Sequence, residues 1–181
     1  MQIKHLIICL TFLFIGQNPD EESMTWNESR KLTWADFKGE VNPNSDAVAL
    51  TASGITFGFS VSTSGSRIVD YSTSVEAHFY PNKSWYNKDK ADDYILGHEQ
   101  LHFDITELYT RLFRQRLTKL RVNQNIRKQL KQLHANINEE LNTTQKRYDE
   151  QSLHSINVEV QNEWREYISA ELAKIEQFKS R

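Results

Sequence analysis

The sequence predicts an α+β fold in which a small antiparallel β-sheet or hairpin region is followed by three long helices. Apolar residues alternate with smaller or polar ones from Ile55 to Val61 and again from Val69 to Phe79, which is the period of a half-buried strand. Beyond about residue 89 the apolar residues recur at intervals of three and four, as in amphipathic helices. A chain of 181 residues suits one domain with its own core.

The N-terminal segment has the features of a signal peptide. A ten-residue apolar run, from Leu6 to Ile15, follows a basic start and ends before Gly16. Such a run is too short to span a bilayer as a helix. We therefore expect residues 1–17 to be removed and residues 18–181 to form one domain. That domain is expected to be periplasmic or extracellular, with no stable membrane span after processing.

Composition argues against several classes of function. The formal net charge is −2, and lysines and glutamates are intermixed, so no basic patch points to nucleic acid as a partner. The one cysteine, Cys9, lies inside the predicted signal peptide, so the mature chain has neither a disulfide nor thiol chemistry. Its core, helped by metal binding, is expected to hold the fold together.

An aromatic segment precedes the strands. Trp34 and Phe37 are three residues apart and follow Thr33, a residue type that caps helices, so one helical turn pinned by aromatic side chains is predicted. Asp36 is expected to be a structural hydrogen-bond acceptor. The loop-forming residues from Asn42 to Asp46 then lead to the first strand.

The two strands are predicted to form a hairpin. The segment from Ser62 to Ser66 contains Gly65 and has the composition of a turn. Glu76 and His78 are expected on the face opposite the buried one, where an isolated histidine is usually solvated. The edge of the hairpin also offers an extended peptide a strand to pair with.

The first long helix, from about Asp89 to Leu120, carries the motif H-E-x-x-H. His98 and His102 are four residues apart, so their imidazoles lie on one face and can bind one metal ion. Glu99 is rotated about 100° from His98 and flanks that ion without binding it. Such a carboxylate can take a proton from a metal-bound water. The motif therefore predicts a zincin-like metal-site helix with Zn²⁺ as the cofactor.

Two other features of this helix allow more than one interpretation. Gly97, directly before His98, costs about 1 kcal/mol relative to alanine in a helix interior. Its lack of a side chain lets another backbone or a substrate approach, and a packing role explains it equally well. The far end is basic and is expected to be a solvated face that suits a helix C-terminus. Its residues are Arg111, Arg114, Arg116, Lys119 and Arg121.

Two further helices are predicted, from about Asn125 to Arg147 and from about Ser155 to Phe178. Their core-facing residues are Ile126, Leu130, Leu133, Ile137 and Leu141 in the first, and Ile156, Val160, Trp164, Ile168, Leu172 and Ile175 in the second. The stretch from Tyr148 to His154 is the predicted break between them. His134 is expected at the surface or the rim.

The third metal ligand is sought in this break, because catalytic zinc usually takes three protein ligands and keeps one position for water. Asp104 and Glu107 point about 180–200° away from the histidines on the helix. His154 is the favoured ligand, with Asp149 and Glu150 as carboxylate alternatives. Asp149 or Asp104 is also expected to accept a hydrogen bond from a ligating imidazole.

Several blocks of the sequence resemble a known family. The blocks are 32–39, 97–105, 148–150 with His154, and 161–164. They are similar, in this order, to the bacterial domain-of-unknown-function family nine-two-two. The resemblance covers nearly the whole mature chain and implies a secreted zinc-dependent protease. It also implies that His98 and His102 are ligands, that Glu99 is the catalytic base, and that the block from Tyr148 to His154 contributes to the site.

One departure from the family lies in the block from Tyr148 to His154, where the family has a threonine and a glycine flanking the histidine. Here the sequence is Ser-Leu-His-Ser over residues 152–155.

These observations together predict an exported zinc metallopeptidase that acts on a peptide or protein substrate. His98, His102 and His154 would bind zinc, and Glu99 would take a proton from water and pass it to the leaving amine. Tyr148 is a candidate donor to the oxyanion, with core packing as its alternative role. Two other functions stay open. One is a non-catalytic exported protein that uses its metal structurally, and the other is a zinc amidase acting on cell-wall peptides.

Overall fold

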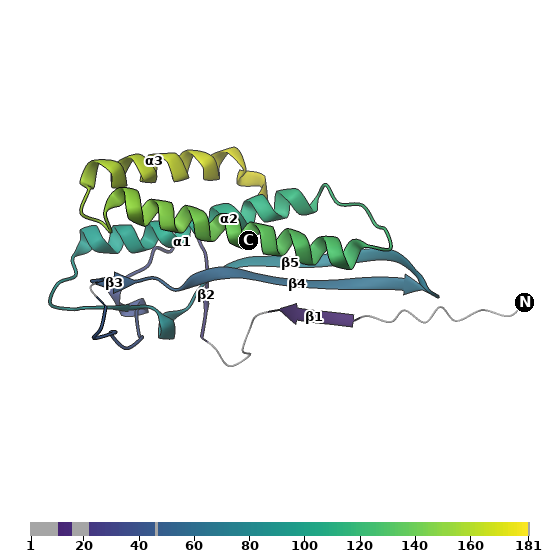
Figure 1. Cartoon of the computed structure of the whole chain (residues 1–181), viewed down its shortest axis with the longest axis horizontal. Coiled ribbons are helices and arrows are strands. Elements are labelled where there is room, and N and C mark those ends of the chain that lie inside the picture. Colours follow the sequence, from purple (N-terminus) through teal and green to yellow (C-terminus); the bar gives the residue numbers. More distant parts are fainter. Residues whose placement is uncertain (1–10, 16–21, 46, 181) are drawn as a thin grey trace, which may run out of the picture.

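The structure, a computed structural model, describes residues 11–15, 22–45 and 47–180. Three helices, α1 (Asp93–Leu117), α2 (Ile126–Ser152) and α3 (Val158–Lys174), lie on one side of a four-stranded antiparallel sheet (Figure 1). Helices α1 and α2 contact the sheet, and α3 packs on those two helices. The predicted α+β class, with strands first and three helices after them, is confirmed.

The hairpin forms the centre of the sheet. Its strands are β4 (Ser53–Ser64) and β5 (Arg67–Phe79), and between them Gly65 has φ +60°, a conformation that favours glycine. Strand β1 (Thr11–Ile15) pairs with β4, and β2 (Met24–Thr25) pairs with the end of β5. A separate two-stranded sheet joins β3 (Ala49–Leu50) to β6 (Trp85–Tyr86).

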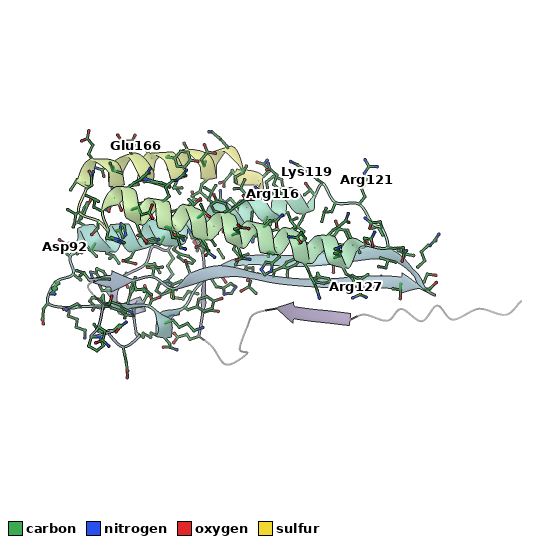
Figure 2. The ribbon with its side chains drawn as sticks, in the orientation of Figure 1. Asp92, Arg116, Lys119, Arg121, Arg127 and Glu166 are labelled. Carbon is green, nitrogen blue, oxygen red and sulfur yellow. The ribbon has the colours of Figure 1, made fainter. Side chains whose placement is uncertain are left out.

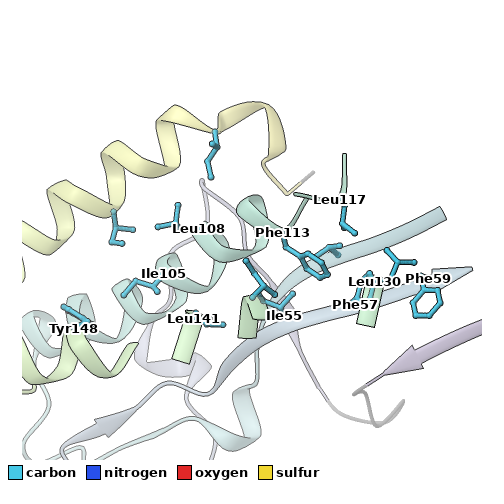
Figure 3. Packing of buried hydrophobic residues seen from close by; sticks show 14 of the residues in the cluster. Ile55, Phe57, Phe59, Ile105, Leu108, Phe113, Leu117, Leu130, Leu141 and Tyr148 are labelled. Atoms are coloured by element: carbon cyan, nitrogen blue, oxygen red, sulfur yellow. The ribbon is translucent and has the colours of Figure 1, made fainter. Parts of the chain in front are cut away.

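The predicted alternation is borne out on β4, because all four of its apolar residues from Ile55 to Val61 are buried. They pack against α1 and α2, where Phe113 and Leu130 are fully buried (Figure 3). Burying such a side chain contributes about 1.5–3 kcal/mol, so this layer dominates the stability of the fold.

A second, smaller core surrounds the aromatic segment. Its short helix η1 (Trp34–Asp36) is the single turn that the sequence predicts. Trp34 stacks on Tyr86 with ring centroids 4.4 Å apart, and Phe37 meets Phe79 edge-on at 5.1 Å. Asp36 accepts hydrogen bonds from the backbone N–H and the hydroxyl of Thr33, at 2.8 and 3.0 Å, which confirms its structural role.

The helix boundaries differ from the prediction at one important place. Helix α1 begins after Asp92, whose side chain accepts a hydrogen bond from the N–H of Ile95 at 2.8 Å (Figure 2). Helix α2 does not end at Arg147 but continues to Ser152. The stretch after Arg147 holds no glycine or proline, and the helix stops where Leu153 adopts the left-handed conformation. Helix α3 is followed by a short turn, η3 (Glu176–Phe178).

The basic end of α1 is only partly the solvated face that the sequence suggests. Lys119 and Arg121 are exposed and point outward (Figure 2). Arg111, however, is 1% exposed and pairs with Glu107 at 2.9 Å, one turn earlier on the helix. Arg114 donates to the carbonyl of Phe178 at 2.7 Å. The prediction is wrong for these two residues because the C-terminal segment folds back over them.

Glu107 is the centre of this buried polar cluster. It is fully buried, and its carboxylate accepts hydrogen bonds from the N–H and the hydroxyl of Ser180 at 3.1 and 2.8 Å. Replacing it with alanine should lower the free energy of unfolding by about 3–5 kcal/mol, because Arg111 would lose its buried counter-charge. Denaturant unfolding followed by circular dichroism measures this change.

A matched control for this prediction is Glu140→Ala. Glu140 pairs with Arg116 at 2.6 Å, but the two side chains are 42% and 33% exposed. Solvent screening limits such a pair to about 0–1 kcal/mol. If the two variants lost the same small amount of stability, the buried cluster would not hold the C-terminal segment in place.

His78 lies deeper than predicted. It is 8% exposed rather than solvated, because Ser23 contacts one ring nitrogen at 3.0 Å and Glu76 the other at 3.1 Å. His134 is half-buried, as expected for a residue at the rim, and its ring packs against Phe57 and Phe113 with centroids 5.2 and 5.9 Å away. Burial lowers the pKa of His134. Neither ring is part of the cluster of metal-binding donors described below.

The predicted signal peptide, residues 1–17, lies outside the described residues except for the five residues of β1. In the part of the chain that the structure describes, none of the helices combines the length and the apolar character needed to cross a membrane.

Candidate metal centre

The two histidines of the H-E-x-x-H motif face each other on α1. His98 is 4% exposed, and its Nε2 atom lies 3.2 Å from Nε2 of His102, one turn later. Their ring planes are nearly perpendicular, at 83°, with centroids 4.8 Å apart. The sequence prediction that both imidazoles converge on one point therefore holds in the geometry.

Asp149 supplies a third donor to this point. Its Oδ1 atom lies 3.2 Å from Nε2 of His98 and 2.9 Å from Nε2 of His102. The carboxylate reaches the histidines because α2 continues past Arg147 and carries Asp149 on its last turns. His98, His102 and Asp149 form the one group of three or more potential ligands found among the described residues.

The three donors fit a zinc ion. Tetrahedral zinc with Zn–N distances of about 2.0–2.1 Å separates neighbouring ligand atoms by roughly 3.3 Å. The observed separations are 2.9, 3.2 and 3.2 Å. Two neutral imidazole nitrogens and a carboxylate oxygen at such distances repel one another unless a cation lies between them. Three protein donors also leave a fourth position for water, as catalytic zinc sites do.

Two glutamines orient the histidines for this role. The Oε1 atom of Gln161, on α3, lies 3.1 Å from Nδ1 of His98, and Oε1 of Gln145, on α2, contacts Nδ1 of His102. The NH₂ group of each amide donates to a backbone carbonyl, from Gln145 to His102 at 2.9 Å and from Gln161 to Tyr94 at 3.4 Å. Each amide oxygen is therefore left to accept from Nδ1–H, so that both Nε2 lone pairs would be free to bind a metal ion held next to Asp149.

Sequence reasoning missed both glutamines. It expected Asp104 or Asp149 to accept from a ligating imidazole, but Asp104 accepts from Trp26 Nε1 at 2.7 Å and from Gln100 Nε2 at 2.9 Å. One signal was available for Gln145, because it lies one helical turn before Asp149 and therefore on the same face of α2.

The charges in the cluster favour a cation. Burial alone would raise the pKa of Asp149, but hydrogen bonds from the two imidazoles outweigh it and bring that pKa well below its usual range. Burial likewise opposes protonation of His102, and the hydrogen bond to Asp149 together with the charge of Glu99 raises the pKa of His102 overall. The carboxylates of Asp149 and Glu99 thus favour positive charge at the position where the imidazoles converge.

Glu99 lies beside the cluster without belonging to it. Its side chain is 4% exposed, and its Oε2 atom has no hydrogen-bond partner among the described residues. A buried carboxylate oxygen without a partner costs free energy, and such atoms are rare unless they serve a function or hold a water. The position agrees with the prediction that Glu99 flanks a metal ion rather than binding it.

Tyr148 forms one wall of the site. It is fully buried, its ring stacks on His98 at 4.5 Å and meets His102 at 5.0 Å, and its hydroxyl has no partner among the described residues. Burial, and then the negative charges of Glu99 and Asp149, raise the pKa of Tyr148. The phenol therefore stays protonated and can donate a hydrogen bond. Its ring also packs in the core, so its position is compatible with both predicted roles.

His154, the favoured third ligand of the sequence analysis, lies at the rim. Its side chain is 78% exposed, and its Nδ1 atom is 3.9 Å from Oδ1 of Asp149. Neither His154 nor the exposed Glu150 belongs to the three-donor cluster. Of the alternatives that the sequence left open, the structure brings Asp149 to the histidines.

The turn that carries His154 has an unusual backbone. Leu153, His154 and Ser155 have φ values of 50°, 52° and 75°, in the left-handed region that favours glycine. Ser155 occupies the position where the resembled family has glycine. Backbone strain of this kind is often found beside functional sites.

A comparison with known families gives one match. The model of the family described as "Bacterial protein of unknown function (DUF922)" matches residues 25–155, which include α1, the whole of α2 and the cluster of His98, His102 and Asp149. No curated protein and no solved structure matches the chain.

Proposed function

The chain belongs to this bacterial family of unknown function, and we propose that it is an exported zinc-dependent peptidase. The observation that carries the proposal is the combination of three converging donors, from His98, His102 and Asp149, with the buried, unpartnered carboxylate oxygen of Glu99 beside them. A purely structural metal site has no use for an additional free carboxylate.

The residues of the site divide into three roles in this proposal. His98, His102 and Asp149 would hold the metal ion, and Gln145 and Gln161 would keep the two imidazoles in position. When bound, the zinc ion supplies Lewis-acid chemistry, in which it polarises the scissile carbonyl and lowers the pKa of a water to about 7.

Glu99 and Tyr148 provide the proton chemistry. Glu99 accepts the proton of the attacking water and then delivers it to the leaving amine, which needs an unpartnered carboxylate oxygen within a water-excluded site. Tyr148 donates a hydrogen bond from its phenolic hydroxyl to the oxyanion that develops on the substrate carbonyl. Its raised pKa keeps that hydrogen in place.

One observation weighs against the purely structural alternative, and the zinc amidase is distinguished by its substrate. A structural zinc site normally has four protein ligands, whereas the described residues bring three donors together here. A zinc amidase acting on cell-wall peptides would use the same groups on the same type of bond, so the nature of the substrate separates it from a peptidase.

Metal removal tests the proposal. Purified protein loaded with one equivalent of zinc should cleave an unfolded protein such as reduced casein, and cleavage should stop on chelation and return on addition of zinc. The products are measured by mass spectrometry, which also detects cleavage of muropeptides. A zinc-loaded, folded protein that cleaves neither substrate would support the non-catalytic alternative instead.

A further inference from the structure

A second cavity lies on a different face of the metal-site helix. It has a volume of about 450 Å³ and opens between α1 and α3 beside the segment that carries Trp26 and Lys31. On α1 its lining includes Gly97 and Leu101, while His98 and His102 face Asp149. The cavity is therefore separate from the candidate metal centre, although Gly97 is the residue next to His98.

All but one of the charged side chains around this cavity are paired. The paired side chains are Glu28 with Lys179 at 2.6 Å, Lys31 with Asp104 at 3.6 Å, and Arg111 with Glu107 and Glu176 at 2.9 and 3.0 Å. Arg165, on α3, also lines the cavity, but it forms no ion pair or hydrogen bond with any described residue. Arg165 is thus the one charged side chain of the described lining without an ion-pair partner, although the charges of the lining as a whole sum to zero.

Gly97 leaves room for the guanidinium group of Arg165 beside α1. A Cβ atom on Gly97 would be 3.3 Å from Nη2 of Arg165, which is tighter than ordinary van der Waals contact. The glycine therefore lets the guanidinium group rest against the backbone of α1. This contact explains a glycine in a helix interior, which is otherwise unfavourable. It favours the packing interpretation of Gly97, with a side chain of α3 as the packed group.

The rest of the lining is suited to an aliphatic group. Leu101 and Ile168 are buried, at 3% and 1% exposure, and with Leu172 they form an apolar floor next to Arg165. Guanidinium groups bind carboxylates through two parallel hydrogen bonds, and pockets of this size hold small organic ligands.

We propose that this cavity binds an aliphatic carboxylate, with the carboxylate on Arg165 and the aliphatic part over Leu101, Ile168 and Leu172. The C-terminal residue of a short peptide and a simple fatty acid share this chemistry. The site is independent of the metal centre and does not rest on the proposed peptidase activity.

Two acids and their neutral counterparts test the proposal. N-acetyl-leucine represents a peptide C-terminus and hexanoate a simple acid, with N-acetyl-leucinamide and hexanol as the uncharged controls. Each is titrated into the zinc-loaded protein and followed by ¹H–¹⁵N NMR. We expect both acids to shift the amide signals of Gly97 and Leu101, and the neutral compounds to bind at least about tenfold more weakly, because a charge-assisted pair is lost. If N-acetyl-leucine binds more tightly, the ligand is a peptide C-terminus; if hexanoate binds more tightly, it is a simple fatty acid.

Variants locate the carboxylate. Arg165→Gln should weaken acid binding about tenfold or more. Arg147→Gln is the matched control: Arg147 packs over Trp164 at 5.1 Å, outside the cavity, and its loss should leave acid binding unchanged. Equal binding of acids and neutral compounds, or acid binding that survives in Arg165→Gln, overturns the proposal. Acid binding that survives in Arg165→Gln would also show that the acids bind at the zinc ion instead.

Discussion

Replacing Glu99 with glutamine should lower the rate of peptide hydrolysis by about 10²–10⁴-fold, the contribution typical of a positioned general base. The substitution keeps the shape of the side chain, so the fold and the positions of His98 and His102 should be retained. Glutamine has no basic oxygen, however, and cannot take the proton of a water molecule. Steady-state kinetics on a fluorogenic peptide measure the loss, and zinc content is measured on the same sample.

The matched control for this prediction is Glu150→Gln. It removes the same charge from an exposed residue directly after Asp149, outside the three-donor cluster. Its kinetics should stay within about twofold of the original protein, since the charge of an exposed side chain is screened by solvent. A Glu99→Gln variant that keeps both its zinc and its turnover would remove Glu99 from the catalytic role.

The part of the site that lies on α1 could be predicted from the sequence. Two histidines four residues apart must share a face of a helix, and the apolar stripe from Leu101 to Leu108 predicts the helix itself. The same geometry placed Glu99 beside the histidines and excluded Asp104 and Glu107 as ligands. Local periodicity sufficed because all of these residues belong to one element.

The parts of the site that come from other helices could not be predicted in the same way. The choice between Asp149 and His154 depended on whether α2 ends at Arg147 or one turn later, and boundaries are the least certain feature of a periodic pattern. Gln161 was also inaccessible, since an amide partner of a histidine has no characteristic spacing. In the fold, the burial of Arg111 depends on Leu172 and Glu176, and that of His78 on Ser23, all far away in sequence.

Replacing Asp149 with alanine should weaken zinc binding by on the order of 10²-fold or more. The loss of a residue that merely orients a ligand costs about 10–100-fold in affinity, so the loss of a direct ligand should cost at least as much. The same change at His154 should have an effect of less than about tenfold, because its ring is exposed and lies 3.9 Å from Asp149 rather than among the donors. Competition with a chromophoric chelator measures both affinities.

Thermal unfolding gives an independent measure of the same difference. A ligand that binds the folded state stabilises it by RT ln(1 + [L]/Kd), so zinc should raise the melting temperature of the original protein and of His154→Ala. Asp149→Ala should lose most of this increase, which is measured for each variant relative to its own melting temperature without zinc. If zinc instead raised the melting temperature of Asp149→Ala more than that of His154→Ala, zinc would have to draw the left-handed turn inward and take His154 as its third ligand. The strained φ values of that turn make its backbone the segment where such a movement would start.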